Sequence, residues 1–372
     1  MGMNKSKKQE LIIFLIIVGV ASFFRLYQLN VLPPDFQNYL LSLRLFSAIL
    51  GILTVVGVYL LTKELFEWRI ASIAAYLTAI SFWHVNFSRT ESVVTIVPFV
   101  TVYALYFIWK GLKHGHITHF IVAGIFGGLG FYTYPSFYVA PIIVLALFIN
   151  YWWYLKKDFD HTKYEFARTK LLQGFVALLL TAFIVALPLV IYSWQHPDNF
   201  FSSIKISAPS VMKTLGMFNF SGDLNQRHNI PGSPILPWPI GVFFAVGIIN
   251  ELIHWLRRKH GHFSTTHTLL LVWFFVMLIP GFLFTGAPNS LMVIGAMPVV
   301  MILTARGIWW FFDKLNSWYK AHDPHSRHEA HVVTALVVII FLFSIGFMEY
   351  WRYFNVWGPS TETINAFKIF TN

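Results

Sequence analysis

The 372-residue sequence contains no cysteine and few charged residues. Without cysteine, disulfide bonds, thiolate nucleophiles and thiolate-ligated metal sites are excluded. Charged residues make up 12% of the chain, whereas soluble domains carry about 25%. Hydrophobic residues make up 56%, which is more apolar surface than a soluble fold can bury. The scarcity of charge therefore predicts a membrane protein.

Apolar runs of about twenty residues recur along the chain, and each is long enough to cross a bilayer core of about 30 Å as a helix. The first run follows a basic flank but lacks a small-residue cleavage site, so we expect an uncleaved helix. The sequence predicts an all-α polytopic membrane protein with about eleven spans, at residues 10–28, 38–62, 69–86, 92–110, 117–134, 136–155, 171–194, 237–256, 267–285, 289–311 and 332–350.

Positive charge is distributed unevenly between the spans. One alternating set of segments, from "NKSKK" to "FDKLNSWYKAHDPHSRH", holds two thirds of the 27 Lys and Arg. Because basic segments stay in the cytoplasm, this alternation predicts a cytoplasmic N-terminus and an extracytoplasmic C-terminus. The net charge of +11 then reflects contact with anionic lipid headgroups in the membrane, and we expect no nucleic-acid partner.

The predicted organisation is a transmembrane domain at 1–350, with an external loop at 195–236, and a short external tail at 351–372. Within the loop, "SSIKISAPSVMKTLGMF" is typical of an amphipathic segment on the membrane surface. Few of the sixteen acids fall on the external side, and these are Asp35, Glu91, Asp198, Asp223, Glu349 and Glu362. Any acid–base chemistry on that face must draw on this short list.

The stretch "ISFWHVNFSRTESVV" places Arg89 and Glu91 at the outer membrane boundary. An arginine can bind phosphate through a forked pair of hydrogen bonds, and a carboxylate can orient a hydroxyl group or bind a metal ion. The alternative is that the pair anchors the helix ends at the interface. Both interpretations stay open at this point.

Two further stretches are candidates for binding. "GGLGFYTYPSFYVAP" carries Tyr132 and Tyr134, which either line a lipid or sugar site or belong to an aromatic belt. Its glycines predict close helix packing, because no strand precedes them as in a phosphate-binding loop. "SGDLNQRHNIPGSP" gathers Asp223, Arg227, His228 and Asn229, whose donors and acceptors suit a sugar or phosphate. The alternative for this second stretch is a well-bonded loop.

The histidine run "AHDPHSRHEAH" has no carboxylate or thiol in a familiar metal-binding pattern, and it lies on the predicted cytoplasmic side. We interpret it as a solvated loop. A divalent metal ion on the external face remains open, with no ligand set defined by the sequence.

Several stretches, in order along the chain, resemble the GT-C class of membrane glycosyltransferases. The similarity is to the family-39-like enzymes related to protein O-mannosyltransferases and aminoarabinose transferases. The stretches that carry it are "RLYQLN" at 25–30, "LRLFSAILGILTVVGVYLLTKELF" at 43–66, "SFWHVNFSRTESVVTIVPF" at 81–99, "GGLGFYTYPSFYVAP" at 127–141, "GDLNQRHNIPGSPIL" at 222–236 and "GAPNSLMVIGAMPVV" at 286–300.

The resemblance implies a GT-C-like helix bundle that transfers a hexose or pentose from a polyprenyl-phosphate donor to an acceptor on the extracytoplasmic face of the plasma (inner) membrane. It implies Asp35 as base and Glu91 as a second acid or metal ligand. Arg89, Tyr132 and Tyr134 would contact the lipid phosphate, and the acceptor or sugar would contact Asp223, Arg227, His228 and Asn229.

The sequence departs from the family in its first external loop. The family usually has a long loop there with an Asp-Glu motif, whereas "LNVLPPDFQNYLL" has one acid and no such pair. Only about twenty residues follow the last span, in place of the family's frequent soluble extension. The alternative function is therefore a catalytically impaired scaffold that binds or carries a polyprenyl lipid. A secondary transporter is less favoured, because the spans contain few ionisable residues.

Overall fold

The computed structural model describes residues 5–33, 40–90, 92–158, 161–196, 208–257, 262–322 and 327–368. These residues form helices and no strand, which confirms the all-α prediction. The first half contains α1 (Lys5–Leu26), α2 (Leu40–Leu65), α3 (Trp68–Ile80), α4 (Phe82–Thr90), α5 (Ser92–His114), α6 (Ile117–Gly130), η1 (Pro135–Val139), α7 (Ala140–Asp158) and α8 (His161–Gln195). The second half contains α9 (Ala208–Gly216), α10 (Trp238–Leu256), α11 (His262–Leu283), η3 (Ile294–Ala296), α12 (Met297–His322), α13 (Arg327–Tyr350), η5 (Trp351–Trp357) and α14 (Thr361–Lys368).

The described residues contain nine helices long and apolar enough to cross a membrane, or ten if one bent pair counts as a span. The length and composition of these helices identify the chain as an integral membrane protein. The predicted number of eleven spans is not confirmed. The predicted span 69–86 consists of α3 and α4, which meet at an angle of 54°. The predicted span 117–134 is α6, whose 14 residues reach only about 21 Å.

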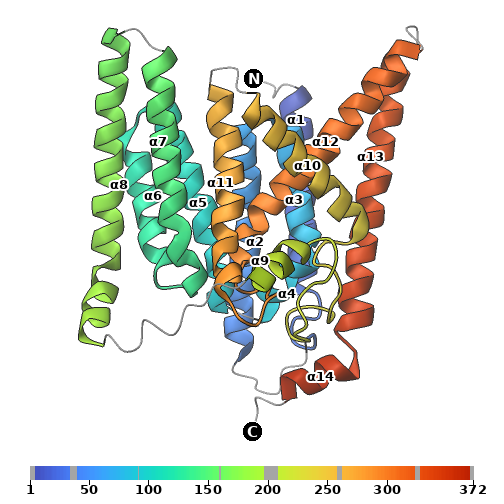
Figure 1. Ribbon diagram of the computed structural model, residues 1–372. Coiled ribbons are helices and arrows are strands. Elements are labelled where there is room, and N and C mark those ends of the chain that lie inside the picture. The colour runs from blue at the N-terminus through green and yellow to red at the C-terminus, as the bar shows by residue number, and fades with distance from the viewer. Residues whose placement is uncertain are drawn as a thin grey trace.

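The helices form a bundle in which α12 is mostly buried, while α8 and α13 expose apolar side chains along its flanks (Figure 1). Helices α4, α9 and α14 lie in the lower part of the view, with the loop at 217–237. We call this the loop end, and the other the opposite end. The described parts of the segments that the sequence predicts to be external lie at the loop end.

Helix α9 has its apolar side chains on the outside. Met212 and Leu215 are exposed, whereas Ser210 and Thr214 are buried, and Thr214 Oγ1 donates to Gly281 O at 3.2 Å. This pattern is the reverse of a soluble surface helix and suits one that contacts lipid. The prediction of an amphipathic segment is confirmed for residues 208–216; its earlier part lies outside the described residues.

Glycine residues set two close helix contacts. A Cβ atom on Gly128 would lie 2.7 Å from Ala182 O, so α6 and α8 pack backbone to backbone, as the glycine spacing predicts. A Cβ atom on Gly247 would lie 1.9 Å from Leu303 O, where α10 crosses α12. Beside this crossing the buried Glu251 of α10 pairs with His267 of α11 and with Arg306 of α12, joining the three helices.

The bend between α3 and α4 exposes backbone groups that a continuous helix would satisfy internally. Arg25 of α1 donates to two of the freed carbonyls, with Nη1 at 2.9 Å from Ala79 O and Nη2 at 3.2 Å from Thr78 O. On the other side of the bend, the backbone N–H of Phe82 donates to the Glu349 carboxylate of α13. Because lipid offers no hydrogen bonds, these two buried side chains make the bend tenable.

We expect Arg25→Leu to destabilise the protein by about 2–6 kcal/mol, because two buried carbonyls would lose their donors at about 1–3 kcal/mol each. The measurement is the thermal unfolding midpoint in detergent. Arg69→Leu is the matched control, since Arg69 is an exposed arginine on α3. Equal midpoints for the two variants would show that Arg25 does not stabilise the bend.

Candidate functional site

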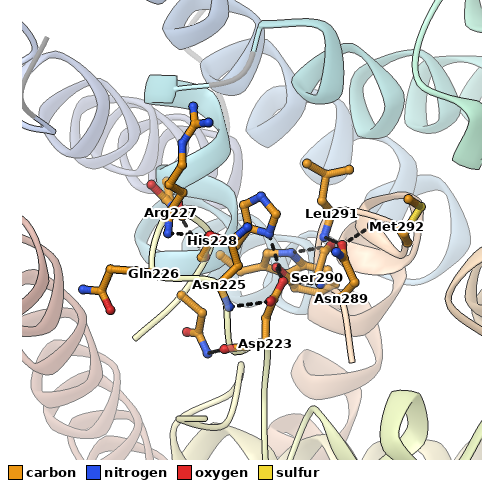
Figure 2. A network of polar contacts seen from close by, with 12 residues as sticks. Asp223, Asn225, Gln226, Arg227, His228, Asn289, Ser290, Leu291 and Met292 are labelled. Carbon is orange, nitrogen blue, oxygen red and sulfur yellow. Dashed lines mark hydrogen bonds and ion pairs between the residues drawn. The ribbon is translucent and has the colours of Figure 1, made fainter. Parts of the chain in front are cut away.

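A cluster of polar groups at the loop end is centred on Asp223 (Figure 2). Its Oδ2 atom accepts hydrogen bonds from Ser290 N and Ser290 Oγ, each at 2.8 Å, and lies 3.0 Å from His228 Nδ1. Its Oδ1 atom accepts from Asn225 N at 2.9 Å. One carboxylate therefore joins the loop at 217–237 to the turn at 284–293. The dense polar stretch at 221–234 is thus held together by hydrogen bonds.

Asp223 is buried, yet its environment favours the charged form. Burial raises the pKa of its carboxyl group, but the hydrogen bonds from His228, Asn225 and Ser290 outweigh this and hold the pKa below its ordinary value of 3.8. The carboxylate accepts bonds throughout and has no need of a proton of its own. At neutral pH Asp223 is a fixed negative charge.

Helix α4 holds this cluster from the bundle side. Trp83 Nε1 donates to Ser290 O at 3.1 Å, and Asn86 Nδ2 donates to Arg227 O at 2.8 Å and to His228 O at 3.1 Å. The direction of α4 after its bend thus decides where the loop backbone lies. Ser290, Trp83 and Asn86 were not predicted from the sequence as site residues, although Trp83 and Asn86 lie in the stretch 80–94 with Arg89 and Glu91.

The C-terminal elements close the cluster from the other side. Trp357 Nε1 of η5 donates to Gln226 O at 2.7 Å, and Gln226 Nε2 donates to Thr363 Oγ1 of α14 at 2.8 Å. Arg352 pairs with Glu349 at 2.8 Å. Residues 351–357, predicted as the start of an external tail, continue α13 and are part of the bundle wall.

Arg227 and His228 are the members of the predicted contact set that keep access to solvent. Asn229 is buried and donates to Ser233 O at 2.6 Å, so like Asp223 it serves the loop itself. The Arg227 guanidinium group lies 4.9 Å from the ring of Phe367 in α14. Figure 2 shows the second nitrogen of His228 directed away from Asp223. The predicted roles of all four stay proposals.

Asp223, His228 and Ser290 do not form a nucleophilic triad. In a triad the serine hydroxyl bonds to the histidine, and the histidine bonds to the acid. Here Ser290 Oγ and His228 Nδ1 both bond to the same carboxylate oxygen. Ser290 is therefore a structural donor, and the chemistry that this arrangement offers is that of an oriented imidazole.

Arg89, predicted to bind phosphate, is fully buried among backbone carbonyls and aromatic rings. Nη1 donates to Phe24 O at 3.0 Å and Nη2 to Leu32 O at 2.7 Å. The guanidinium group also lies 5.4 Å from the ring of Tyr353. Because Arg89 is 0% exposed, the described structure gives a phosphate group no direct access to it.

The remaining predicted residues lie apart from the cluster or outside the described residues. Tyr132 is exposed at the end of α6, and its hydroxyl group donates to Val185 O at 2.9 Å, while Tyr134 packs against the core. Asp35 and Glu91 lie outside the described residues. Within the described part of the chain, no three His, Asp or Glu side chains are grouped closely enough to hold a metal ion.

A cavity of about 860 Å³ lies between α5, α6, η1, α7 and α8. No charged side chain lines it, and its walls include Phe137, Phe175 and Ala186. Three lining residues carry a hydroxyl group: Thr101 and Ser193 donate theirs to carbonyls of their own helices, and the third is Tyr138. The other lining side chains are apolar. The turn η3, shortly after Ser290, contacts both α5 and η1. The cavity and the Asp223 cluster are therefore joined through one short segment.

Residues 35–194 match the sequence model of the dolichyl-phosphate-mannose-protein mannosyltransferase family. This stretch is a little under half of the chain and includes every element that lines the cavity. The Asp223 cluster lies beyond it. No curated protein matches the chain.

The whole bundle resembles solved structures of the oligosaccharyltransferase of the archaeon Archaeoglobus fulgidus. With a tethered acceptor peptide containing the NVT sequon, that enzyme superimposes with a TM-score of 0.59 at 17% identity, over 95% of this chain and 56% of that one. For the same enzyme, AglB, with an inhibitory peptide and a dolichol-phosphate, the TM-score is 0.59 at 15% identity, over 96% and 57%. The apo form gives a TM-score of 0.54 at 16% identity, over 94% and 52%.

The resemblance to the GT-C glycosyltransferases is confirmed. At 15–17% identity the likeness to these structures concerns the fold. The chain spans a little over half the length of the enzyme that it resembles.

We expect Asp223→Asn to destabilise the protein by about 1.5–3 kcal/mol, the usual value of a hydrogen bond to a charged group. Because the pKa of Asp223 is lower in the folded chain, its contribution is complete above about pH 4 and is lost as the pH falls through the folded-state value. Thermal unfolding at neutral and acidic pH tests both points. Asp313→Asn, at an exposed position of α12, is the control. A pH dependence that persists unchanged in Asp223→Asn would contradict this.

Proposed function

We propose that the protein transfers a sugar from a polyprenyl-phosphate donor to an acceptor hydroxyl group at the loop end. The acceptor oxygen attacks the anomeric carbon, a base takes its proton, and polyprenyl phosphate leaves with the bonding electrons. The observation that carries this proposal is the apolar cavity, which has room for hydrocarbon and is linked to a polar cluster by η3.

The cavity suits a lipid chain better than a polar metabolite. A volume of about 860 Å³ falls in the upper part of the range for small-molecule sites, roughly 300–1,000 Å³. Burying an unpaired polar group in such a cavity would cost free energy, whereas an isoprenoid chain needs no hydrogen-bond partner there. The match of residues 35–194 to a family named for a dolichyl-phosphate donor supports the same ligand class.

Residue roles in the proposal follow the sequence hypotheses. Asp35 precedes α2 in the sequence and Glu91 precedes α5; the sequence hypothesis takes Asp35 as base and Glu91 as second acid or metal ligand. Arg89, Tyr132 and Tyr134 are proposed near the lipid phosphate. Arg227 and His228, which have access to solvent, are proposed to contact the sugar or acceptor, with Asp223 and Asn229 shaping the loop beneath them.

The loop end is proposed to face the extracytoplasmic side of the plasma (inner) membrane, because the basic segments lie at the opposite end. The polyprenyl-phosphate donor would then enter the protein from the surrounding membrane. No step of the proposed reaction depends on a divalent metal ion, for which the sequence defines no ligand set.

The test is transfer from radiolabelled polyprenyl-phosphate hexoses and pentoses by the full chain in lipid nanodiscs. We expect release of polyprenyl phosphate with at least one donor. Ala186→Phe, which fills the cavity from α8, should raise the donor KM about tenfold, since tenfold corresponds to a loss of about 1.4 kcal/mol. Ala335→Phe, on the exposed face of α13, is the matched control.

Saturable donor binding without turnover by the unmodified chain would favour the scaffold that binds or carries a lipid. Equal donor KM values for Ala186→Phe and Ala335→Phe would show that the donor does not occupy the cavity. Neither binding nor turnover with any donor would contradict the proposed function.

A further inference from the structure

We infer that His228, oriented by Asp223, is the general base that removes the proton from the acceptor hydroxyl group. The inference rests on the proposed function and assigns its proton transfer to a residue that the sequence hypothesis treated as a contact. It also accounts for how the reaction proceeds in a chain whose first external loop has one acid and no Asp-Glu pair.

The ring of His228 is held in one orientation and one tautomer. Asp223 is ionised and can only accept, so His228 Nδ1 must carry the hydrogen of their 3.0 Å contact. The carboxylate itself is fixed by Ser290 and Asn225, and the backbone of His228 is fixed by Asn86. With the hydrogen on Nδ1, the lone pair on Nε2 is left as the basic site.

Nε2 is accessible. The His228 side chain is 11% exposed, and Nε2 is neither bonded within the described part of the chain nor among its buried unpaired atoms. A histidine with a purely structural role would be expected to use both nitrogens or to bury the second one. His84 of α4 is such a case, with Nδ1 at 2.6 Å from Arg25 Nη2 and Nε2 buried.

The acids at the loop end are less suited to the task within the described residues. Asp223 and Glu349 are buried, and their oxygens accept bonds from several donors. Glu362 is exposed at the start of α14, and no hydrogen bond to a described residue orients its carboxylate. Among the described residues at the loop end, His228 is therefore the base that is both accessible and oriented.

The charged groups around His228 support its role. Asp223 contacts it directly and stabilises the imidazolium ion that forms when the proton arrives. From α4 it faces the ring of Phe87, with centroids 5.5 Å apart, and Arg89 of the same helix turns to the carbonyls of Phe24 and Leu32. Arg227 extends toward Phe367, and Arg352 pairs with Glu349. The turn at 284–293 presents Ser290, which is uncharged.

The acceptor O–H bond breaks, and its proton moves to Nε2 of neutral His228. The acceptor oxygen forms a bond to the anomeric carbon, and the bond from that carbon to the phosphate oxygen breaks with its electron pair on polyprenyl phosphate. The imidazolium ion then releases its proton to water.

The experiment measures kcat and the donor KM against pH for the full chain in nanodiscs, using a donor that the unmodified chain turns over. We expect His228→Gln to lower kcat by about 10²–10⁴-fold, the usual contribution of a general base, with the donor KM unchanged. The fall in kcat/KM toward low pH, where an imidazolium ion cannot accept a proton, should disappear in this variant. Added imidazole should partly restore turnover to His228→Ala.

His114→Gln, an exposed histidine at the opposite end, is the matched control and should keep the full pH profile. Loss of turnover in Asp35→Asn with retention in His228→Gln would overturn the inference and make Asp35 the base, while the proposed function stands. A kcat/KM that rises toward low pH would also overturn it. No turnover by the unmodified chain would reject the proposed function, and the inference with it.

Discussion

The structure depends on how the bend between α3 and α4 is stabilised inside the bundle. Arg25 approaches from α1 and satisfies Thr78 O and Ala79 O, while Glu349 approaches from α13 and accepts from Phe82 N. A bend in lipid would otherwise leave these groups unpaired. Once α4 is directed inward, Trp83 and Asn86 reach the turn at Ser290 and the loop at 227–228. The position of the polar cluster therefore depends on Arg25 and Glu349, two buried charged residues that make no hydrogen bond to Asp223.

The short turn after α1 is stabilised in a similar way. Arg44 donates to Pro33 O at 3.0 Å and to Arg89 O at 2.9 Å, and Arg89 donates to Phe24 O and Leu32 O. Two buried arginines thus bind the carbonyls at the end of α1 and the start of the turn. The turn is thus hydrogen-bonded up to Pro33.

Hydropathy predicted the helices well, because a run of apolar residues is a local property of the chain. It did not predict the bend at Ser81, since Arg25 and Glu349 lie 53 and 267 residues from the groups that they satisfy. The cluster at 221–234 was visible as a dense polar stretch, but Ser290, 67 residues from Asp223, was not. Arg89 shows why an ionisable residue in apolar surroundings is ambiguous: binding phosphate and binding backbone carbonyls leave the same pattern in a sequence.

The proposed function requires that a polyprenyl donor occupies the cavity between α5 and α8, with its phosphate group toward the loop end. The most direct measurement is photo-crosslinking with a polyprenyl phosphate that carries a diazirine in its chain, followed by mass spectrometry of the labelled peptides. We predict labelling in α5–α8 around Phe175 and Val190, which line the cavity, and competition by unlabelled donor. Saturable labelling confined to the groove between α1 and α13, around Tyr76 and Phe347, would contradict the account.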